Sequence, residues 1–312
     1  MKVCFIGSCG HWQQALSTLK SRGDVLLCGF APGSSEENRR YSIDESLPYF
    51  EDYREMLDTV KPDLVVLSPV FGITGRLIIE CAERGIAVFS EKPIASSNEE
   101  LKRVVAAIRK SKIPFCSMHY TRFSPAFYHA AKIIEDGKIG QIRMITAQKS
   151  YRYGVRPDWY SDPELYCGTI PWVGIHAVDW IYRFTGKRFT SVSSIAVGEC
   201  PEMAALCQFE LEGGIIASIN IDYYRPDGAP THDDDRIRCV GTSGVLEIRS
   251  NTVLLINKEG SREYRPSDAP DLFAEFLDGK NPIGLDEIHH VTKAVLCAKD
   301  AAKHGKTVRI GA

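Results

Sequence analysis

The chain has 312 residues, of which 44% are hydrophobic and 25% are charged, as in a globular protein long enough to form two domains. The 38 basic and 40 acidic residues leave a formal net charge of -2, so we expect a small-molecule substrate and no nucleic-acid partner. No apolar run reaches the length of a membrane span or a signal peptide, which predicts a cytoplasmic protein with no membrane partner.

Short apolar runs alternate with longer helical patterns over the first 120 residues. Strands are expected at 2–7, 25–29, 64–68, 87–89 and 114–118. Helices are expected between them at 13–21, 53–58, 74–84 and 98–110, with several ending on glycine or proline. This alternation is typical of a parallel sheet with helices on both faces. It predicts an α/β Rossmann domain over residues 1–120.

The sequence pattern changes after residue 120, where consecutive strand patterns replace the alternation of strands and helices. This change predicts a second domain over residues 121–312. One helix is expected at 126–135, and strand patterns follow at 142–148, 204–211, 215–223, 236–240 and 245–248. Two more helices are expected at 170–184 and 286–303. Because the strands follow one another with tight turns, we expect an α+β domain with a large, mostly antiparallel open sheet.

The segment Gly7-Ser8-Cys9-Gly10-His11-Trp12 joins the first expected strand to the first expected helix. In this context glycine permits close backbone approach, and the helix N-terminus offers free N–H groups to a pyrophosphate. The match to GxGxxG is partial, because Cys9 and Trp12 stand where the second and third glycines are expected. Taken alone, the segment is equally compatible with a dinucleotide site and with a plain connecting turn.

The end of the second expected strand bears on the choice of cofactor. Ala31 and Ser34 lie where they would face a dinucleotide, but no carboxylate stands at the end of the strand to hold the ribose hydroxyls of NAD. Ser34, Ser35 and Arg39 could bind a 2′-phosphate or belong to a solvated loop. We therefore predict NAD or NADP, with the pattern slightly favouring NADP.

Ten cysteines are scattered along the chain without a CxxC pair, so no metal site is predicted. Most of them, including Cys4, Cys28 and Cys207 in strand-like runs, are expected to be small buried residues in a reducing compartment. The run 232–235, His-Asp-Asp-Asp, has metal-ligand residue types. Four consecutive residues cannot all face one ion, so we expect a solvated acidic loop.

Four further segments occur in order along the chain: Ser90-Glu91-Lys92-Pro93, then 120–125, 137–140 and 174–179. Together they resemble the Gfo/Idh/MocA family of glucose-fructose oxidoreductase and inositol dehydrogenase over nearly the whole chain. The resemblance implies an NAD(P)-dependent dehydrogenase or reductase acting on CH–OH groups of a sugar, cyclitol or related polyol, with substrate binding in the second domain. It also implies a homodimer or homotetramer formed by the outer face of the open sheet.

Two other classes share this fold and stay open at this point. One is an NAD-assisted glycosidase, which oxidises its substrate transiently. The other is a non-catalytic, dinucleotide-binding regulator.

The lysine of the Glu-Lys-Pro segment contacts the reacting hydroxyl and the cofactor ribose in the family, so the resemblance gives this role to Lys92. An ammonium group beside a hydroxyl stabilises the developing alkoxide charge. Glu91 and Pro93 are implied to lie at the cofactor, and Pro93 is the position of a cis bond in relatives. The alternative is a surface lysine in a turn that ends on proline.

Ser68, Pro69 and Phe71 follow the third expected strand and are implied to contact the cofactor. The family often has Thr-Pro-Asn-His at this place, whereas this chain has Ser-Pro-Val-Phe. Contacts made by the backbone can survive such a change.

His176 lies in the expected helix 170–184, which has Thr169 as its N-cap. Because histidine titrates near neutrality, His176 is the best candidate for a general acid/base. The alternative is a core histidine satisfied by Asp179, a residue that we expect to have an orienting or structural role.

Trp172 stands one turn before His176, where dehydrogenases of the family commonly have an aspartate. An indole can stack on a sugar ring but cannot accept a proton, so we expect Trp172 to wall the substrate site beside a ligand-sized void. His119 and Tyr153 are further substrate candidates. The aromatic residues around 151–160 could equally belong to a core or an interface.

Overall fold

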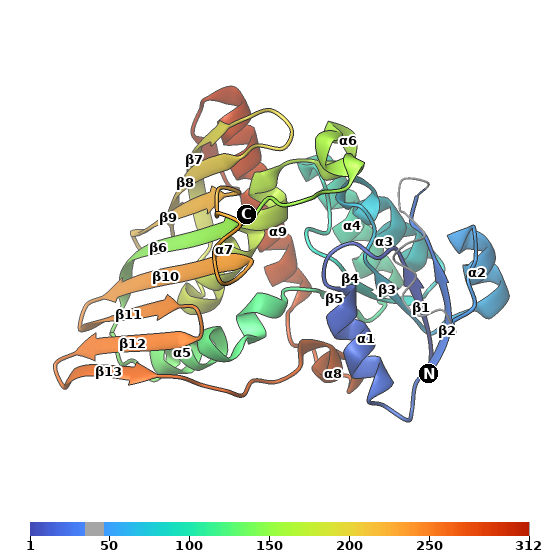
Figure 1. The fold of residues 1–312 in the computed structure, drawn as a ribbon, viewed down its shortest axis with the longest axis horizontal. Helices are drawn as coiled ribbons and strands as arrows, with labels where there is room; N and C mark the ends of the chain where they lie inside the picture. The colour runs from blue at the N-terminus through green and yellow to red at the C-terminus, as the bar shows by residue number, and fades with distance from the viewer. Residues whose placement is uncertain (35–46, 312) are drawn as a thin grey trace. The chain divides into compact units, whose positions relative to one another are not determined.

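The computed structural model describes residues 1–34 and 47–311 (Figure 1). Contacts divide the chain into two compact units, each assembled from separate stretches. The first unit holds Met1–Met118, Glu164–Cys167 and Asp271–Thr292, and the second holds His119–Pro163, Gly168–Pro270 and Lys293–Ala312. The predicted domain boundary at residue 120 stays a prediction.

A parallel sheet forms the core of the first unit. Its strands, in the order β2-β1-β3-β4-β5, are β2 (Leu26–Ala31), β1 (Lys2–Ile6), β3 (Leu64–Leu67), β4 (Ala87–Ser90) and β5 (Phe115–Ser117). Every residue of β3 and β5 is buried, as expected for strands covered on both faces. The predicted α/β Rossmann architecture is confirmed, with strand ends shifted by one or two residues.

Helices connect these strands, and a capping side chain marks the start of some of them. They are α1 (Trp12–Lys20), α2 (Tyr53–Val60), η2 (Phe71–Ile73), α3 (Thr74–Glu83) and α4 (Asn98–Ser111). The side chain of Ser97 accepts a hydrogen bond from the Glu100 N–H at the start of α4, which satisfies a donor that the helix leaves unpaired. The first unit also includes α8 (Leu272–Leu277), where Phe273 stacks on Phe89 at a centroid distance of 4.3 Å.

The second unit is built on a large open sheet in which all neighbouring pairs are antiparallel except β6 and β9. In spatial order its strands are β13 (Gly260–Tyr264), β12 (Thr252–Asn257), β11 (Gly244–Arg249), β10 (Asp233–Gly241), β6 (Ile142–Tyr151), β9 (Ile215–Asp222), β8 (Ala204–Leu211), β7 (Phe189–Val197) and β14 (Val308–Arg309). Burial alternates along β8 and β9, so one face is packed and the other is open. The predicted mostly antiparallel sheet is confirmed.

Two helices of this unit, α5 (Pro125–Glu135) and α7 (Thr169–Thr185), pack on one face of the sheet, behind the strands in Figure 1. The short helix η3 (Tyr120–Phe123) contacts both of them, and η4 (Asp158–Ser161) lies between β6 and α7 in the chain. The short helix α6 (Pro163–Tyr166) and the long helix α9 (Leu285–His304) contribute residues to both units. Among the described residues, no helix has both the length and the hydrophobicity needed to cross a lipid bilayer.

The start of α7 corrects one expectation. Gly168 is the N-cap residue, and Thr169, which we predicted there, is the first residue of the helix. The Thr169 N–H donates to Glu202 Oε2 at 2.7 Å, and its hydroxyl donates to the Glu202 carbonyl oxygen at 2.7 Å. A carboxylate from a distant segment therefore satisfies the helix start, and the local sequence pattern does not contain this information.

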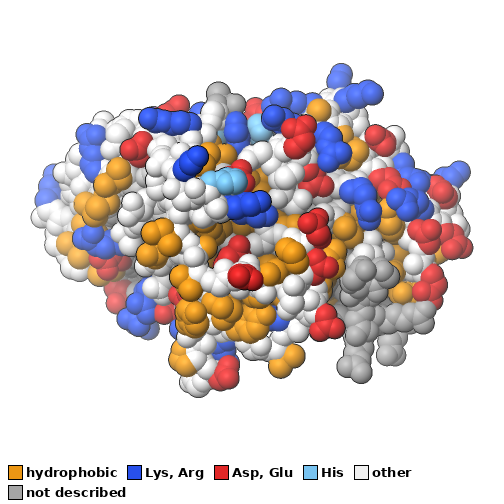
Figure 2. All heavy atoms as spheres, turned by 90° about the horizontal axis from the view of Figure 1, so that it is seen from above, with side chains coloured by type: hydrophobic (Ala, Val, Ile, Leu, Met, Phe, Trp, Pro, Cys, Tyr) orange, Lys and Arg blue, Asp and Glu red, His pale blue; other side chains and the backbone are white. Residues whose placement is uncertain are grey.

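The mixture of surface charges and the burial of most cysteines agree with what the amino-acid composition predicts. Acidic and basic side chains are interspersed over the face drawn in Figure 2. Cys4 and Cys207 are buried in strands as predicted, whereas Cys28 is half-buried, and all ten cysteines are free thiols.

Candidate functional site

Gly7 and Gly10 shape the turn between β1 and α1. Their φ angles are +77° and +81°, a region that glycine adopts without steric cost. A Cβ atom on Gly7 would lie 2.5 Å from Pro69 Cα. A Cβ atom on Gly10 would collide with the Glu91 carboxylate. Both positions therefore require glycine for backbone conformation and for space.

Backbone hydrogen bonds tie this turn to the ends of two neighbouring strands. The Gly7 N–H donates to the Ala31 carbonyl oxygen at 2.9 Å, and the Cys9 N–H donates to the Ser68 carbonyl oxygen at 2.6 Å. The Ser68 hydroxyl in turn donates to the Cys9 carbonyl oxygen. The structure thus brings the predicted residues of three chain segments together at the carboxyl edge of the sheet.

The Glu91 carboxylate is fully buried and braces the turn from the end of β4. It accepts the His11 N–H at 2.8 Å and lies 2.9 Å from His11 Nδ1. Lys92 Nζ lies 3.6 Å from Glu91 Oε1, and only 3% of the lysine is exposed. The alternative of a surface lysine is therefore wrong. The Lys92–Pro93 peptide bond is cis, as predicted.

Burial and charge act in opposite directions on Glu91. Burial alone raises the pKa of the Glu91 carboxyl, but the charge of His11, its hydrogen bonds and the charge of Lys92 together lower this pKa below its usual range. The carboxylate is therefore ionised at neutral pH. Sequence reasoning placed Glu91 at the cofactor but did not predict that it connects the glycine turn to Lys92.

The remaining cofactor candidates lie in the same unit. Phe71 begins η2 and is buried, and Ser34 follows the end of β2. The predicted contribution of Ser35 and Arg39 lies outside the described residues.

In the second unit, α7 carries His176 beside Thr121. His176 Nδ1 lies 3.1 Å from Thr121 Oγ1, and the Trp180 indole N–H donates to the same oxygen at 3.0 Å. Because an indole only donates, the threonine oxygen is an acceptor toward Trp180, and its own proton is available for Nδ1. This arrangement favours the His176 tautomer that carries its proton on Nε2. Sequence reasoning quoted the 120–125 segment without recognising Thr121 as the partner.

Asp179 has a partner other than the one considered from the sequence. Arg122 Nε donates to Asp179 Oδ2 at 2.8 Å, and Arg122 Nη2 contacts the other carboxylate oxygen. His119 Nε2 lies 3.9 Å from Asp179 Oδ1, and all three residues are buried. The alternative in which Asp179 satisfies His176 is therefore wrong, because Arg122 holds the carboxylate.

The predicted substrate residues Trp172 and Tyr153 belong to one aromatic cluster. The Trp172 indole N–H donates to the Tyr160 hydroxyl at 3.1 Å. The Tyr153 ring meets the Tyr223 ring edge-on at a centroid distance of 5.4 Å. The Arg156 guanidinium connects these pairs, because it lies 5.0 Å from the Tyr160 ring and 5.9 Å from the Tyr153 ring. Sequence reasoning missed Arg156, although the arginine stands within the aromatic run.

The prediction of a solvated acidic loop at residues 232–235 is wrong. Asp233 begins β10, and β10 pairs with β6 so that Asp235 lies opposite Lys149. Lys149 is buried and its ammonium group lies 2.6 Å from the Asp235 carboxylate. A buried ammonium needs a charged partner, and this requirement explains an aspartate at the start of a strand.

Comparison with known proteins places both parts of the chain. Residues 1–119 match the oxidoreductase family with an NAD-binding Rossmann fold, and residues 127–247 match the GFO/IDH/MocA C-terminal domain. A solved Thermotoga maritima structure, provisionally described as an oxidoreductase, is 39% identical with a TM-score of 0.95 and covers 99% of this chain and 100% of its own.

Two named relatives are similar over most of their length. The scyllo-inositol 2-dehydrogenase (NAD(+)) of Bacillus subtilis is 26% identical over 99% of this chain and 95% of its own. The trans-1,2-dihydrobenzene-1,2-diol dehydrogenase of Xenopus tropicalis is 22% identical over 94% of this chain and 88% of its own. With both domain matches in order and a 39% identical relative aligned from end to end, this chain belongs to the Gfo/Idh/MocA family of NAD-binding oxidoreductases.

Proposed function

We propose that this oxidoreductase transfers a hydride between a nicotinamide dinucleotide and a CH–OH group of a sugar, cyclitol or related polyol. The observation that carries the proposal is the buried Glu91–Lys92 pair beside the glycine turn, with 3.6 Å between the charged groups. The names of two relatives support the substrate class, since they specify an inositol and a dihydrobenzene diol.

The turn has the features that a dinucleotide phosphate requires. No side chain caps α1, and its first turn contains no acidic residue. The first N–H groups of α1, at Trp12 and Gln13, therefore suit the pyrophosphate. The bound nicotinamide would supply the group that accepts or returns the hydride. Because β2 ends without a carboxylate among the described residues, we propose a preference for NADP over NAD.

Residues of the chain itself would bind the substrate hydroxyl, exchange its proton and enclose the substrate. Lys92 would hold the reacting hydroxyl and stabilise negative charge on its oxygen, while the Glu91 carboxylate keeps the ammonium oriented. His176 would exchange the hydroxyl proton through Nε2, because Thr121 occupies Nδ1. Trp172 and Tyr153 would form the wall of the substrate site.

Dinucleotide titration and a substrate screen test this proposal. Titration with NADH and NADPH should quench tryptophan fluorescence saturably, and a screen of sugars and cyclitols should change the absorbance of the nicotinamide. Lys92→Ala should abolish turnover while dinucleotide affinity changes by at most about tenfold, because one charge-assisted contact contributes about 1.5 kcal/mol. Lys102→Ala, at an exposed lysine of α4, is the control. Binding without turnover of any substrate would favour the regulator class, and absence of binding would refute both.

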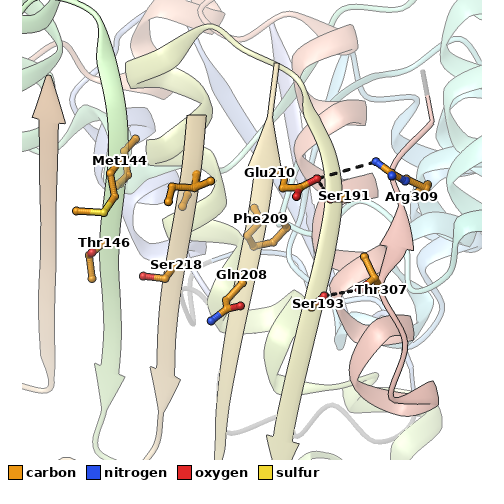
Figure 3. Close-up of a pocket in the computed structure, with 13 residues that line it drawn as sticks. Met144, Thr146, Ser191, Ser193, Gln208, Phe209, Glu210, Ser218, Thr307 and Arg309 are labelled. Carbon is orange, nitrogen blue, oxygen red and sulfur yellow. Dashed lines mark hydrogen bonds and ion pairs between the residues drawn. The ribbon is translucent and has the colours of Figure 1, made fainter. Parts of the chain in front are cut away.

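We also propose that a second copy of the chain covers the outer face of the open sheet. Ile195 and Leu206 are paired across β7 and β8 and are 70% and 56% exposed. Ile216 on β9 is 55% exposed and lines a neighbouring hollow of about 440 Å³. Polar side chains such as Gln208 and Arg309 complete this surface (Figure 3). Exposed apolar patches rimmed by polar residues are typical of interfaces.

Light scattering after size exclusion tests this assembly. We expect a dimer or tetramer for the native chain and a monomer for Leu206→Glu, because a charge in the interface is left unpaired. Leu26→Glu, at an exposed leucine of β2 in the first unit, should keep the native mass. A native chain that elutes as a monomer would contradict the proposal.

A further inference from the structure

Arg156 is enclosed by tyrosine rings in the loop after β6. Its guanidinium carbon lies 5.0 Å from the ring centroid of Tyr160, 5.4 Å from that of Tyr223 and 5.9 Å from that of Tyr153. These distances are within the range of cation–π attraction. The rings therefore hold a rigid planar donor in a fixed place, rather than a flexible surface side chain.

Neither Arg156 nor the nearby Arg152 has a carboxylate partner among residues 1–34 and 47–311. Arg156 Nη2 donates to the Arg152 carbonyl oxygen at 3.0 Å. The Nε atoms of both arginines are buried and have no hydrogen-bond partner within the same residues. A guanidinium carries five N–H donors, so most of the donors in this pair are not used by the described protein.

Several other arginines of the same unit have carboxylate partners. Arg122 is paired with Asp179, and Arg183 is paired with Glu135. Asp234 forms ion pairs with both Arg225 and Arg236. The buried Lys149 ammonium also has a carboxylate, that of Asp235. Arg152 and Arg156, by contrast, have no ion pair with a carboxylate of the described residues.

The side chain of His232 lies in the same cluster, and the neighbouring charges affect its pKa. It stacks on Tyr151 at a centroid distance of 4.9 Å. Burial and then the charge of Arg156, with smaller contributions from Arg152 and Lys149, outweigh the opposing Asp233 and lower the pKa of His232 below its ordinary value. The charges of Arg156, Arg152 and Lys149 therefore outweigh that of Asp233 at this position, and the same charges attract an anionic group.

The cluster includes both aromatic residues proposed as walls of the substrate site. Tyr153 is one of the rings around Arg156. Trp172 is linked to a second ring, since its indole N–H donates to the Tyr160 hydroxyl. A ligand that stacks on these walls would thus lie beside an arginine whose guanidinium is planar and matches carboxylate and phosphate geometry.

We propose that Arg156, assisted by Arg152, binds an anionic group of the substrate, so that the preferred polyol carries a carboxylate or a phosphate ester. This inference rests on the proposed function and assigns its substrate class. A neutral polyol would leave both guanidinium groups without an anionic partner. An acidic one would be oriented by two parallel hydrogen bonds to a single side chain.

Calorimetric titration of the full chain saturated with reduced dinucleotide tests the inference without requiring turnover. The probes are D-gluconate and glucose 6-phosphate, with D-glucose and myo-inositol as neutral counterparts. We expect the native protein to bind at least one anionic probe about tenfold or more tightly than either neutral probe. The gluconate and phosphate arms show which anion the site prefers.

Two variants separate recognition from packing. Arg156→Gln should reduce the affinity for the anionic probe about tenfold or more and leave neutral probes unchanged, and Arg156→Lys should recover part of the loss because it keeps the charge. Arg262→Gln is the control, since Arg262 lies 4.9 Å from the Tyr264 ring on the exposed strand β13. The control variant should bind all probes like the native protein.

Three results would overturn the inference. These are failure of both anionic probes to bind, equal affinity for charged and neutral probes, and an Arg156→Gln variant that behaves like Arg262→Gln. Saturable dinucleotide binding together with one of these results would leave the proposed hydride transfer intact. Loss of anion discrimination would therefore be distinguishable from failure of the proposed function.

Discussion

The Nδ1 atom of His176 lies 3.1 Å from the Oγ1 atom of Thr121. The same hydroxyl oxygen accepts the Trp180 indole N–H at 3.0 Å, so one threonine fixes both the ring orientation and the preferred tautomer of the histidine. A histidine held in this way presents Nε2 for proton exchange. The proposed general-acid/base role of His176 would therefore depend on a residue that has no titratable group.

Thr121→Val should alter the pH profile of turnover, because valine keeps the shape of threonine but removes the hydroxyl. Loss of one hydrogen bond, worth about 0.5–1.5 kcal/mol, should lower kcat about three- to tenfold. The limb of the profile that reports His176 should shift as well. Thr121→Ser should restore both values. A valine variant with the native profile would show that His176 is not the acid/base.

Glu91 should make stability depend on pH in the acidic range. Its pKa is lower in the folded protein than the ordinary glutamate value, which is about 4.3. Its ionisation therefore contributes stability above that ordinary value, and the contribution is lost as the pH falls through the folded pKa.

Denaturant unfolding at a series of pH values measures this effect. Glu91→Gln should be less stable than the native protein at neutral pH, and the difference should shrink in acid. Glu99→Gln, at an exposed glutamate of α4, should follow the native curve. A constant difference between Glu91→Gln and the native protein at every pH would contradict the assignment.

Gly7→Ala should cost more stability than a change at a glycine with a similar φ but open surroundings. Gly85 has a φ of +73°, and a Cβ atom added there would have no heavy atom within 4 Å, so Gly85→Ala should cost only the backbone strain, about 1–2 kcal/mol. Gly7→Ala adds the collision with Pro69 and should also weaken NADH binding. Equal unfolding free energies and native dinucleotide affinity in both variants would disprove the role of the turn.

Asp179→Asn should destabilise the second unit strongly, because it removes the buried carboxylate charge that the Arg122 guanidinium contacts through two of its nitrogen atoms. Breaking a buried ion pair from one side typically costs about 3–5 kcal/mol. Glu247→Gln breaks the exposed pair with Arg238 and should cost at most about 1 kcal/mol. Unfolding free energies from denaturant titration compare the two, and similar values would show that the Arg122 pair is not structural.

Elements with a strong hydrophobic period were predictable from the sequence. The alternation along β8 predicts the same bounds that the structure shows, Ala204–Leu211, and the apolar runs of the parallel strands are visible in the same way. β13 was not predicted, because an exposed edge strand has no buried face and leaves no apolar pattern. β7 and β12 were also missed, although their buried positions show that a weaker alternation is present.

The candidate site was predictable from the sequence only where its residues belong to one short sequence motif. The Glu-Lys-Pro segment and His176 stand in recognisable motifs, whereas the contact of Glu91 with His11 spans 80 positions. The pairing of Lys149 with Asp235 spans 86 positions. Such partners are brought together by strand order, so the sequence shows the charges but not which carboxylate neutralises which cation. The uncompensated pair Arg152 and Arg156 became visible only after the other pairs were assigned.

The first unit is assembled from separate stretches of the chain, so a continuous N-terminal fragment does not contain all of it. A fragment that stops after Met118 lacks Asp271–Thr292, and with it the rings of Phe273 and Phe276 that lie 4.3 and 5.6 Å from the Phe89 ring. Phe89 immediately precedes Ser90, Glu91 and Lys92 on the same strand and loop. Truncation would therefore uncover the Phe89 ring at the end of the strand that leads to the charged pair, and we expect a stable fragment to need the helix α8, carried on a linker or as a co-expressed peptide.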